Sequence, residues 1–203
     1  VHRRPKTMHE AIDAIDRTIE RLEKYPDIER AQLRGIEGAT ARAYFAGVGA
    51  ILPPALGFTG RNRRPPRDPF NVCLSLGYTL LLSDAVKATR TAGLDPMIGL
   101  LHDLTPGRDS LALDLCEPVR PLVDEWAVKL FTQHSLRADA FSTSRGGGCR
   151  LGKAGRRTFY TQFEEAAPLM RRVLRRGASS LVERLREFDG NNVNLLNSPV
   201  FEP

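Results

Sequence analysis

The sequence is poor in cysteine, and its three cysteines lie far apart. Cys73, Cys116 and Cys149 are odd in number, and their spacing matches neither a disulfide framework nor a zinc finger. A reducing compartment, the cytoplasm, is therefore expected. The chain also lacks an apolar run close to the roughly 20 residues that cross a membrane, and no signal peptide opens it. These absences predict a soluble protein without a membrane partner.

The charge balance favours a polyanionic partner. The 203 residues include 30 Lys and Arg against 24 Asp and Glu, which gives a formal net charge of +6. Hydrophobic residues make up 41% of the chain, enough for one or two ordinary cores. A basic chain of this kind is typical of proteins that bind nucleic acid, although a mild arginine excess also occurs in proteins that bind none.

Apolar residues recur at three- and four-residue spacing through most of the chain, which predicts an all-α fold. The expected helices cover about residues 7–24, 28–46, 69–92, 118–134, 158–176 and 179–188. The helix that opens at Pro69 is apolar almost all round, so it is expected to form the centre of the core. Residues 111–115 alternate like a strand, yet Asp109 or Ser110 could cap a helix there, and this boundary stays open.

Two stretches lack a helical pattern. Residues 47–68 are rich in Gly and Pro and end in a set of four arginines: Arg61, Arg63, Arg64 and Arg67. Guanidinium groups bind phosphate oxygens bidentately and proline lowers the entropy lost on docking, so this loop is expected to contact phosphate; a solvated loop is the alternative. Residues 142–155 lack the Gly-Lys-Ser/Thr ending of a phosphate-binding loop, and a mobile linker is expected there.

The stretch from Gly99 to Asp124 carries the candidate chemistry. His102 ends an apolar run that is expected to anchor it, and Asp114 and Glu117 follow three residues apart, a spacing that shares one helix face. One imidazole and hard carboxylate oxygens can hold Mg²⁺ or Mn²⁺ and leave coordination positions free. A lone histidine in such a setting is more often a satisfied core residue, and the two carboxylates that follow argue against that reading.

A further carboxylate is needed if the site is to carry net negative charge, and Glu37 is the best upstream candidate. Gly35 and Gly38 flank it on the second expected helix, which leaves room for another helix or a phosphate backbone. The structural alternative is that Glu37 pairs with Arg34 on the surface.

Several motifs, in this order, resemble a known family. GIEGATARAYF resembles its Glu-bearing helix, FTGRNRRPPRDPFNVCLSLGYTLL its Arg-rich loop and following helix, and GLLHD with LALDLCEPVRPLVD its His and acidic segments. Together they resemble the CRISPR-associated spacer-acquisition integrases, the Cas-one family. The resemblance covers roughly residues 33–174 and corresponds to the α-helical catalytic domain of that family.

The resemblance implies a metal-dependent DNA integrase, in which the 3′-hydroxyl of a captured DNA fragment attacks a phosphodiester at the edge of a repeat array. Carried over to this sequence, Glu37, His102 and Glu117 would coordinate Mg²⁺ or Mn²⁺ as the catalytic residues. Asp114 would complete or support the acidic pocket. The four loop arginines would hold the backbone of double-stranded DNA, and the arginines within residues 171–176 would form a weaker second patch.

The resemblance also implies partners and a domain organisation. The family works with a companion protein of the Cas-two family, and a homodimer is expected. Because no strand pattern precedes the first helix, the amino-terminal β-domain of the family is expected to be absent from this chain. The expected organisation is one helical catalytic domain, residues 1–188, followed by a polar tail, residues 189–203.

Two other functions stay open from the sequence. A basic helical bundle can bind DNA without chemistry, so a scaffold module of an adaptation complex is one of them. The pair His102-Asp103 in a helical chain suggests an HD-type phosphohydrolase as the other. That class needs a further histidine upstream, and only His2 and His9 are available.

Overall fold

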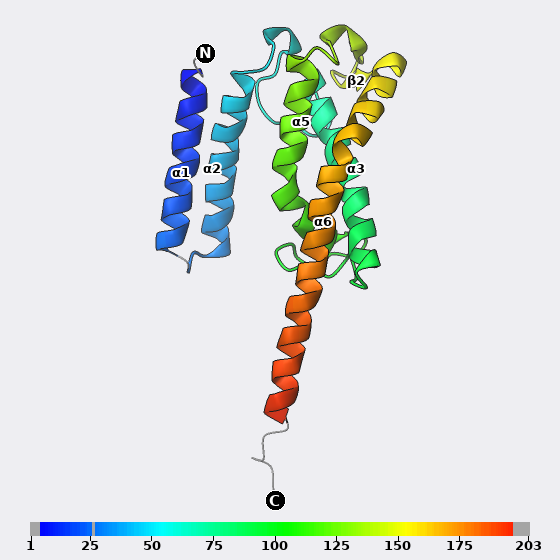
Figure 1. Cartoon of the computed structure of the whole chain (residues 1–203). Helices are drawn as coiled ribbons and strands as arrows, with labels where there is room; N and C mark the ends of the chain where they lie inside the picture. Colours follow the sequence, from blue (N-terminus) through cyan, green and yellow to red (C-terminus); the bar gives the residue numbers. More distant parts are fainter. Residues whose placement is uncertain (1–4, 26, 197–203) are drawn as a thin grey trace, which may run out of the picture. The chain divides into compact units, whose positions relative to one another are not determined.

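Nearly all the regular structure of the chain is helical, which confirms the all-α prediction. The computed structural model describes residues 5–25 and 27–196. Its elements are α1 (Lys6–Lys24), α2 (Arg30–Gly49), η1 (Pro54–Leu56), α3 (Pro69–Thr91), α4 (Ser110–Cys116), η2 (Glu117–Val119), α5 (Arg120–Thr132), η3 (Ala138–Ala140), β1 (Phe141–Thr143), β2 (Cys149–Leu151) and α6 (Lys153–Leu196) (Figure 1). In the described part of the chain, β1 and β2 form the only sheet.

The chain divides into two compact units. The first unit comprises residues 1–75 and 126–161, and the second comprises residues 76–125 and 162–203. Helices α3, α5 and α6 contribute residues to both units. The catalytic domain expected over residues 1–188 includes parts of both, and its boundary stays a prediction. Residues 197–203 of the expected tail lie outside the described residues.

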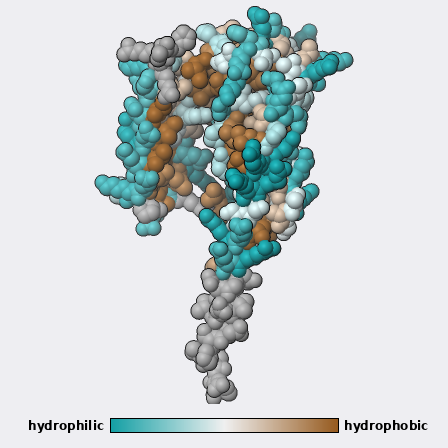
Figure 2. All heavy atoms as spheres, viewed as in Figure 1, coloured by the Kyte–Doolittle hydropathy of each residue, from teal (hydrophilic) through white to brown (hydrophobic). Residues whose placement is uncertain are grey.

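In the first unit, α1 and α2 lie side by side (Figure 1). Gly47 of α2 permits the close approach, because a Cβ there would lie only 2.7 Å from the Cβ of Ala11, which is 4% exposed. The hydroxyl groups of Thr18 and Thr40 form a hydrogen bond of 3.1 Å. Figure 2 shows a band of hydrophobic residues over this pair and hydrophilic residues along its outer edge, which fits two amphipathic helices.

A series of aromatic rings links α2 to the other elements of the first unit. Phe45 of α2 contacts Phe58, and Phe58 meets Phe70 at the start of α3 edge to face, with centroids 5.0 Å apart. Phe70 contacts Phe131 of α5, which in turn contacts Phe141 of β1. Because edge-to-face pairs add about 0.5–1.5 kcal/mol beyond burial, this series stabilises the first unit.

Helix α3 begins and ends where the sequence predicts. Asp68 caps its start, since Oδ1 accepts the backbone N–H of Asn71 at 2.8 Å. Gly93, with φ of 79°, ends it, and the N–H of Leu94 donates to the carbonyl of Thr89 at 3.0 Å in a Schellman motif. By length and composition alone, α3 is the one described helix that is long and apolar enough to cross a membrane, and 44% of its most apolar window is buried inside the protein.

The stretch at residues 142–155 contains a hairpin, so the predicted mobile linker is wrong. β1 pairs with β2 in antiparallel register, with Thr143 opposite Cys149. The turn closes with a 2.9 Å hydrogen bond from the N–H of Gly147 to the carbonyl of Ser144, and Gly147 has a φ of 76°, which glycine adopts without strain. The short 3₁₀ turn η1 likewise lies in residues 47–68, where no regular element is predicted.

Helix α6 is continuous over 44 residues, where the sequence predicts two shorter helices that end at residue 188. Gly177, at the predicted break, costs a helix interior only about 1 kcal/mol relative to alanine. Its missing side chain also admits Leu115 of α4, whose Cδ2 would lie 3.3 Å from a Cβ at this position. Residues 111–115, which alternate like a strand, lie in α4. Packing within the second unit therefore outweighs both the glycine at the predicted helix break and the strand-like alternation of residues 111–115.

Candidate functional site

The predicted metal-site residues are distributed over the two units. Glu37 is exposed on α2 in the first unit. The second unit holds His102 in the loop before α4, Asp114 within α4 and Glu117 at the start of η2. The structure brings His102 and Asp114 into direct contact. Within the described residues of either unit, no group of three or more His, Cys, Asp or Glu side chains gathers in a way that could hold a metal ion.

The Asp114 carboxylate accepts hydrogen bonds on both of its oxygens. Oδ2 accepts the backbone N–H groups of Leu100 at 2.5 Å and Leu101 at 2.9 Å. Oδ1 accepts the backbone N–H of His102 at 3.1 Å and contacts its ring Nδ1 at 2.5 Å. Burial alone would raise the pKa of Asp114, but these hydrogen bonds, led by that from Leu101, outweigh it and hold the pKa below its usual range. Asp114 is therefore a carboxylate at neutral pH.

The loop before His102 is fixed through its backbone. The apolar side chains predicted to anchor the histidine are mostly in solvent, since Ile98, Leu100 and Leu101 are 61%, 63% and 73% exposed. The expected anchoring by apolar burial is therefore wrong. The acid that contacts the His102 ring is Asp114 of α4, twelve residues further along the chain.

Glu117 is held by an arginine and stays accessible. Nη1 of Arg120 lies 3.1 Å from Oε1 of Glu117, and the two side chains are 28% and 35% exposed. The Arg120 guanidinium also lies over the ring of Tyr78, 5.3 Å from its centroid. The Tyr78 hydroxyl donates in turn to the buried carboxylate of Asp124, which gives both polar groups a partner. This network restrains Glu117 without burying it.

One buried amide fastens the loop that carries the four arginines. Asn71 of α3 is 0% exposed. Its Oδ1 accepts from Nη1 of Arg61 at 2.7 Å and from the backbone N–H of Asn62 at 3.1 Å. Its Nδ2 donates to the carbonyl of Gly60 at 2.8 Å and to Oδ2 of Asp68 at 2.6 Å. The loop is thus tied to the start of α3 at several points.

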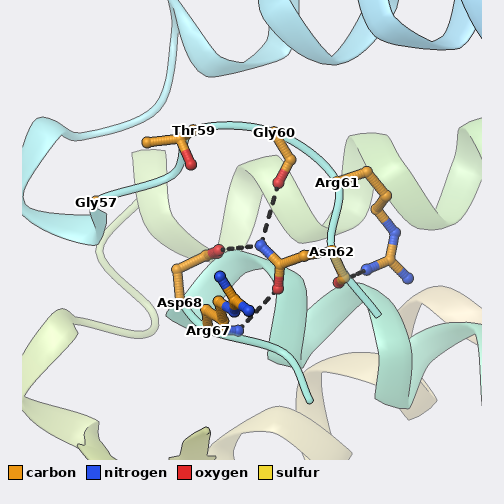
Figure 3. A pocket seen from close by; sticks show the side chains of 7 residues that line it. All are labelled: Gly57, Thr59, Gly60, Arg61, Asn62, Arg67 and Asp68. Atoms are coloured by element: carbon orange, nitrogen blue, oxygen red, sulfur yellow. Dashed lines mark hydrogen bonds between the residues drawn. The ribbon is translucent and has the colours of Figure 1, made fainter. Parts of the chain in front are cut away.

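The four predicted DNA-binding arginines differ in their surroundings. Arg61 is half-buried, and its Nη2 also donates to Oγ of Ser75 at 3.3 Å, whereas Arg63, Arg64 and Arg67 are exposed. A pocket of about 270 Å³ opens beside them (Figure 3). It is lined by Gly57, Thr59, Gly60, Arg61, Asn62, Arg67 and Asp68. Arg61 therefore braces the loop, and the other three present their charges to solvent.

One arginine of the expected second patch is engaged within the second unit. Arg171 of α6 forms two hydrogen bonds of 2.8 Å with Glu164 and one of 2.7 Å with Asp84 of α3. The hydrogen bond from Arg171 holds the pKa of Glu164 below its usual range. Arg171 therefore joins α3 to α6, while Arg172, Arg175 and Arg176 are exposed.

Two residues of the second unit, His102 and Glu117, carry donor atoms of the kinds that a hard divalent cation takes. Since Nδ1 of His102 faces Asp114, its Nε2 is the nitrogen left for a ligand, as is usual for histidines that bind metals. Glu117 adds an accessible carboxylate. An imidazole together with carboxylate oxygens fits Mn²⁺ and Mg²⁺.

Known proteins resemble this chain over most of its length. A family model described as CRISPR associated protein Cas1 matches residues 1–165. The CRISPR-associated endonuclease Cas1 1 of Thermodesulfovibrio yellowstonii is 39% identical over 178 residues, which cover 87% of this chain and 56% of the relative. The CRISPR-associated endonuclease Cas1 2 of Rhodospirillum rubrum is 44% identical over 166 residues, covering 79% and 48%. The chain thus spans about half the length of these curated relatives.

Solved structures share the fold as well. A chain from the solved structure of a Cas6-RT-Cas1--Cas2 complex superimposes with a TM-score of 0.74 and 26% identity, over 89% of this chain and 23% of that chain. The matched residues include the Glu-bearing helix, the arginine loop and the His and acidic segments. Because the family model matches most of its length, this chain belongs to the CRISPR associated protein Cas1 family, the Cas-one family that its motifs resemble.

Proposed function

We propose that the chain carries the catalytic residues of a metal-dependent DNA integrase and endonuclease of CRISPR adaptation. In the proposed reaction, the 3′-hydroxyl of a captured DNA fragment attacks a phosphodiester of the repeat array, and the array strand leaves as a new 3′-hydroxyl. One observation carries the proposal: the family match over residues 1–165 contains every candidate catalytic residue, and the curated relatives are named endonucleases.

Glu37, His102 and Glu117 are the proposed ligands of Mg²⁺ or Mn²⁺. When bound, the cation would polarise phosphoryl oxygens and stabilise the departing oxygen. His102 would use Nε2, because Nδ1 is occupied by Asp114. Glu117 would approach with its carboxylate restrained by Arg120.

Double-stranded DNA is the proposed substrate and partner. The exposed Arg63, Arg64 and Arg67 support this, because they sit on a loop that hydrogen bonds already hold in one conformation. Such contacts position the duplex and carry little sequence information. A companion of the Cas-two family is also proposed, in line with the similar chain found in a Cas6-RT-Cas1--Cas2 complex. Homodimer formation and a cytoplasmic location follow from the same proposal.

Strand transfer tests the proposal directly. The purified chain is mixed with a labelled DNA end, a supercoiled plasmid with a repeat array, and Mn²⁺. Glu37→Ala, His102→Ala and Glu117→Ala are expected to abolish strand transfer and to leave DNA binding largely intact. Glu23→Ala and His9→Ala, which remove exposed groups of the same kinds, are matched controls that should keep the activity.

The outcome separates catalysis from simple DNA binding. Strand transfer that persists in Glu37→Ala and His102→Ala would refute the proposed site. DNA binding without any transfer by the unmodified chain would instead favour the non-catalytic scaffold module.

A further inference from the structure

The hydrogen-bonding capacity of Asp114 is already used within the second unit. An ionised carboxylate offers about four lone-pair positions. In this structure the two oxygens of Asp114 take the N–H groups of Leu100, Leu101 and His102 together with the ring nitrogen of His102. The Asp114 side chain is only 6% exposed. It therefore has little capacity left for a cation.

The same contacts determine which ring nitrogen of His102 carries the proton. An ionised carboxylate can only accept, so Nδ1 of His102 must be the donor in the 2.5 Å contact with Oδ1. In the neutral ring the proton is then on Nδ1, and Nε2 presents a lone pair. The sequence patterns give no indication of this arrangement, because the donors come from an irregular loop 12 to 14 residues away from Asp114.

Gly99 allows the loop to close around the carboxylate. A Cβ at Gly99 would lie 2.6 Å from the carbonyl oxygen of His102, 2.7 Å from Cβ of Ser110 and 3.1 Å from Oδ2 of Asp114. The hydroxyl of Ser110, at the start of α4, donates to the carbonyl of Asp103 at 2.9 Å and so ties the loop to the helix. The loop is therefore shaped around Asp114, and the position of His102 depends on that carboxylate.

We propose that Asp114 is a positioning residue, which fixes the tautomer and orientation of His102 and does not itself bind the cation. This inference rests on the proposed function for the role of His102. It reduces the ligand set of this segment to His102 and Glu117. Asp114 then acts on the cation only through the imidazole that it holds.

The tautomer of His102 tests the inference without metal or DNA. Long-range ¹H–¹⁵N spectra of the ¹⁵N-labelled chain, recorded at alkaline pH where imidazole is neutral, distinguish the two ring nitrogens. The chain has four histidines, and His102→Gln identifies the signals of the one that matters. The unmodified chain is expected to show the Nδ1–H tautomer. An Nε2–H tautomer in a chain that binds Mn²⁺ would overturn the positioning role alone.

A double-mutant cycle on Mn²⁺ affinity separates a positioning residue from a ligand. Asp114→Asn should weaken Mn²⁺ binding by about 10–100-fold in the otherwise unmodified chain. In the His102→Ala background it should cause no further loss, because the residue it positions is already gone. A further loss of tenfold or more there would show direct coordination and overturn the inference. If the unmodified chain binds no Mn²⁺, the proposed function fails and the role of Asp114 at a cation fails with it.

Discussion

Asn71 shows how one side chain determines the conformation of a functional loop. Its buried amide holds Gly60, Arg61, Asn62 and Asp68, so Asn71→Ala leaves several polar groups of the loop without their partner. The expected cost is about 2–4 kcal/mol of unfolding free energy. Urea denaturation followed by circular dichroism measures it.

A matched control lies on the same loop. Thr59 is exposed at the pocket (Figure 3), and Thr59→Ala should change the unfolding free energy by less than about 0.5 kcal/mol. Equal losses in the two variants would mean that the buried amide contributes nothing specific to stability.

The cysteines make a second prediction at the residue scale, because burial suppresses their reactivity. Burial raises the pKa of the Cys116 thiol to about 12 and also raises the pKa of Cys73 and Cys149. A raised pKa leaves less thiolate at any given pH, and the thiolate is the form that reacts. At about pH 8 iodoacetamide should therefore leave the native chain unmodified and alkylate the chain in urea at all three positions.

Mass spectrometry of the alkylated chain provides the readout. Ser179→Cys places a thiol at an exposed position of α6 and should be alkylated rapidly in the native state. Native labelling of Cys116 at the rate of that control would contradict its burial in α4.

Some single-residue features could be predicted from the sequence and others could not. The helix predicted to open at Pro69 does begin there, and Asp68, directly before that proline, caps it. The environment of His102 follows no periodic pattern, because backbone groups of an irregular loop create it. Gly99 belongs to that environment, and its role becomes visible only once the close contacts around it are known.

At the scale of elements, the glycines of α2 have opposite roles. Gly47 lies against α1, and a Cβ there would meet Ala11 at 2.7 Å and Met8 at 3.5 Å. A Cβ at Gly35 would meet nothing within 4 Å. Gly47→Ala should therefore destabilise the chain by about 1–3 kcal/mol through overpacking. Gly35→Ala should stabilise it by about 0.5–1 kcal/mol, since alanine favours a helix interior.

Chemical denaturation of the two variants under identical conditions measures both effects. If Gly47→Ala and Gly35→Ala changed the unfolding free energy in the same direction, the close packing of α1 on α2 in the first unit would be contradicted. The open space at Gly35 also agrees with the interpretation that the glycines beside Glu37 leave room for an approaching group.

Element boundaries were the least predictable part of the fold. The starts of α1 and α3 follow from a periodic pattern and a proline, and both are found within two residues of their predicted positions. The hairpin has strands of three residues, too short for an alternating pattern. Its position is instead set by contacts with residues distant in sequence, such as the 2.7 Å hydrogen bond from the Cys149 N–H to the carbonyl of Pro66.

At the scale of the whole molecule, the order of the motifs in the sequence was enough to identify the family. The sequence alone was not enough to assign a role to each residue of the candidate site. The motif segments lie on α2, on the arginine loop with α3, and on the loop and helices around His102, Asp114 and Glu117, and the chain belongs to the family that they resemble. The sequence could not distinguish a ligand from a residue that orients one, because Asp114 and Glu117 are both carboxylates near His102. Their surroundings differ in the structure, since Asp114 accepts several hydrogen bonds and Glu117 is accessible, and the proposed roles rest on that difference.

The net charge of +6 and the exposed loop arginines lead to a prediction about DNA binding by the complete chain. Each phosphate that an arginine contacts releases counterions. A plot of the logarithm of the binding constant for duplex DNA against the logarithm of the salt concentration should therefore have a slope of about −0.9 per contact. Arg63 and Arg64 are exposed on a loop held in one conformation. The double variant Arg63→Ala, Arg64→Ala should therefore lower the magnitude of this slope by about two units, one for each arginine removed.

Arg171 supplies the matched control, because its charge is already paired with Glu164 and Asp84. Arg171→Ala removes one positive charge from the molecule but no charge that is free to meet a phosphate, so its salt slope should equal that of the unmodified chain. Fluorescence anisotropy with a labelled duplex at several salt concentrations gives both slopes. If Arg171→Ala flattened the salt dependence as much as the loop variant, overall charge would govern binding and the arginine loop would have no special role.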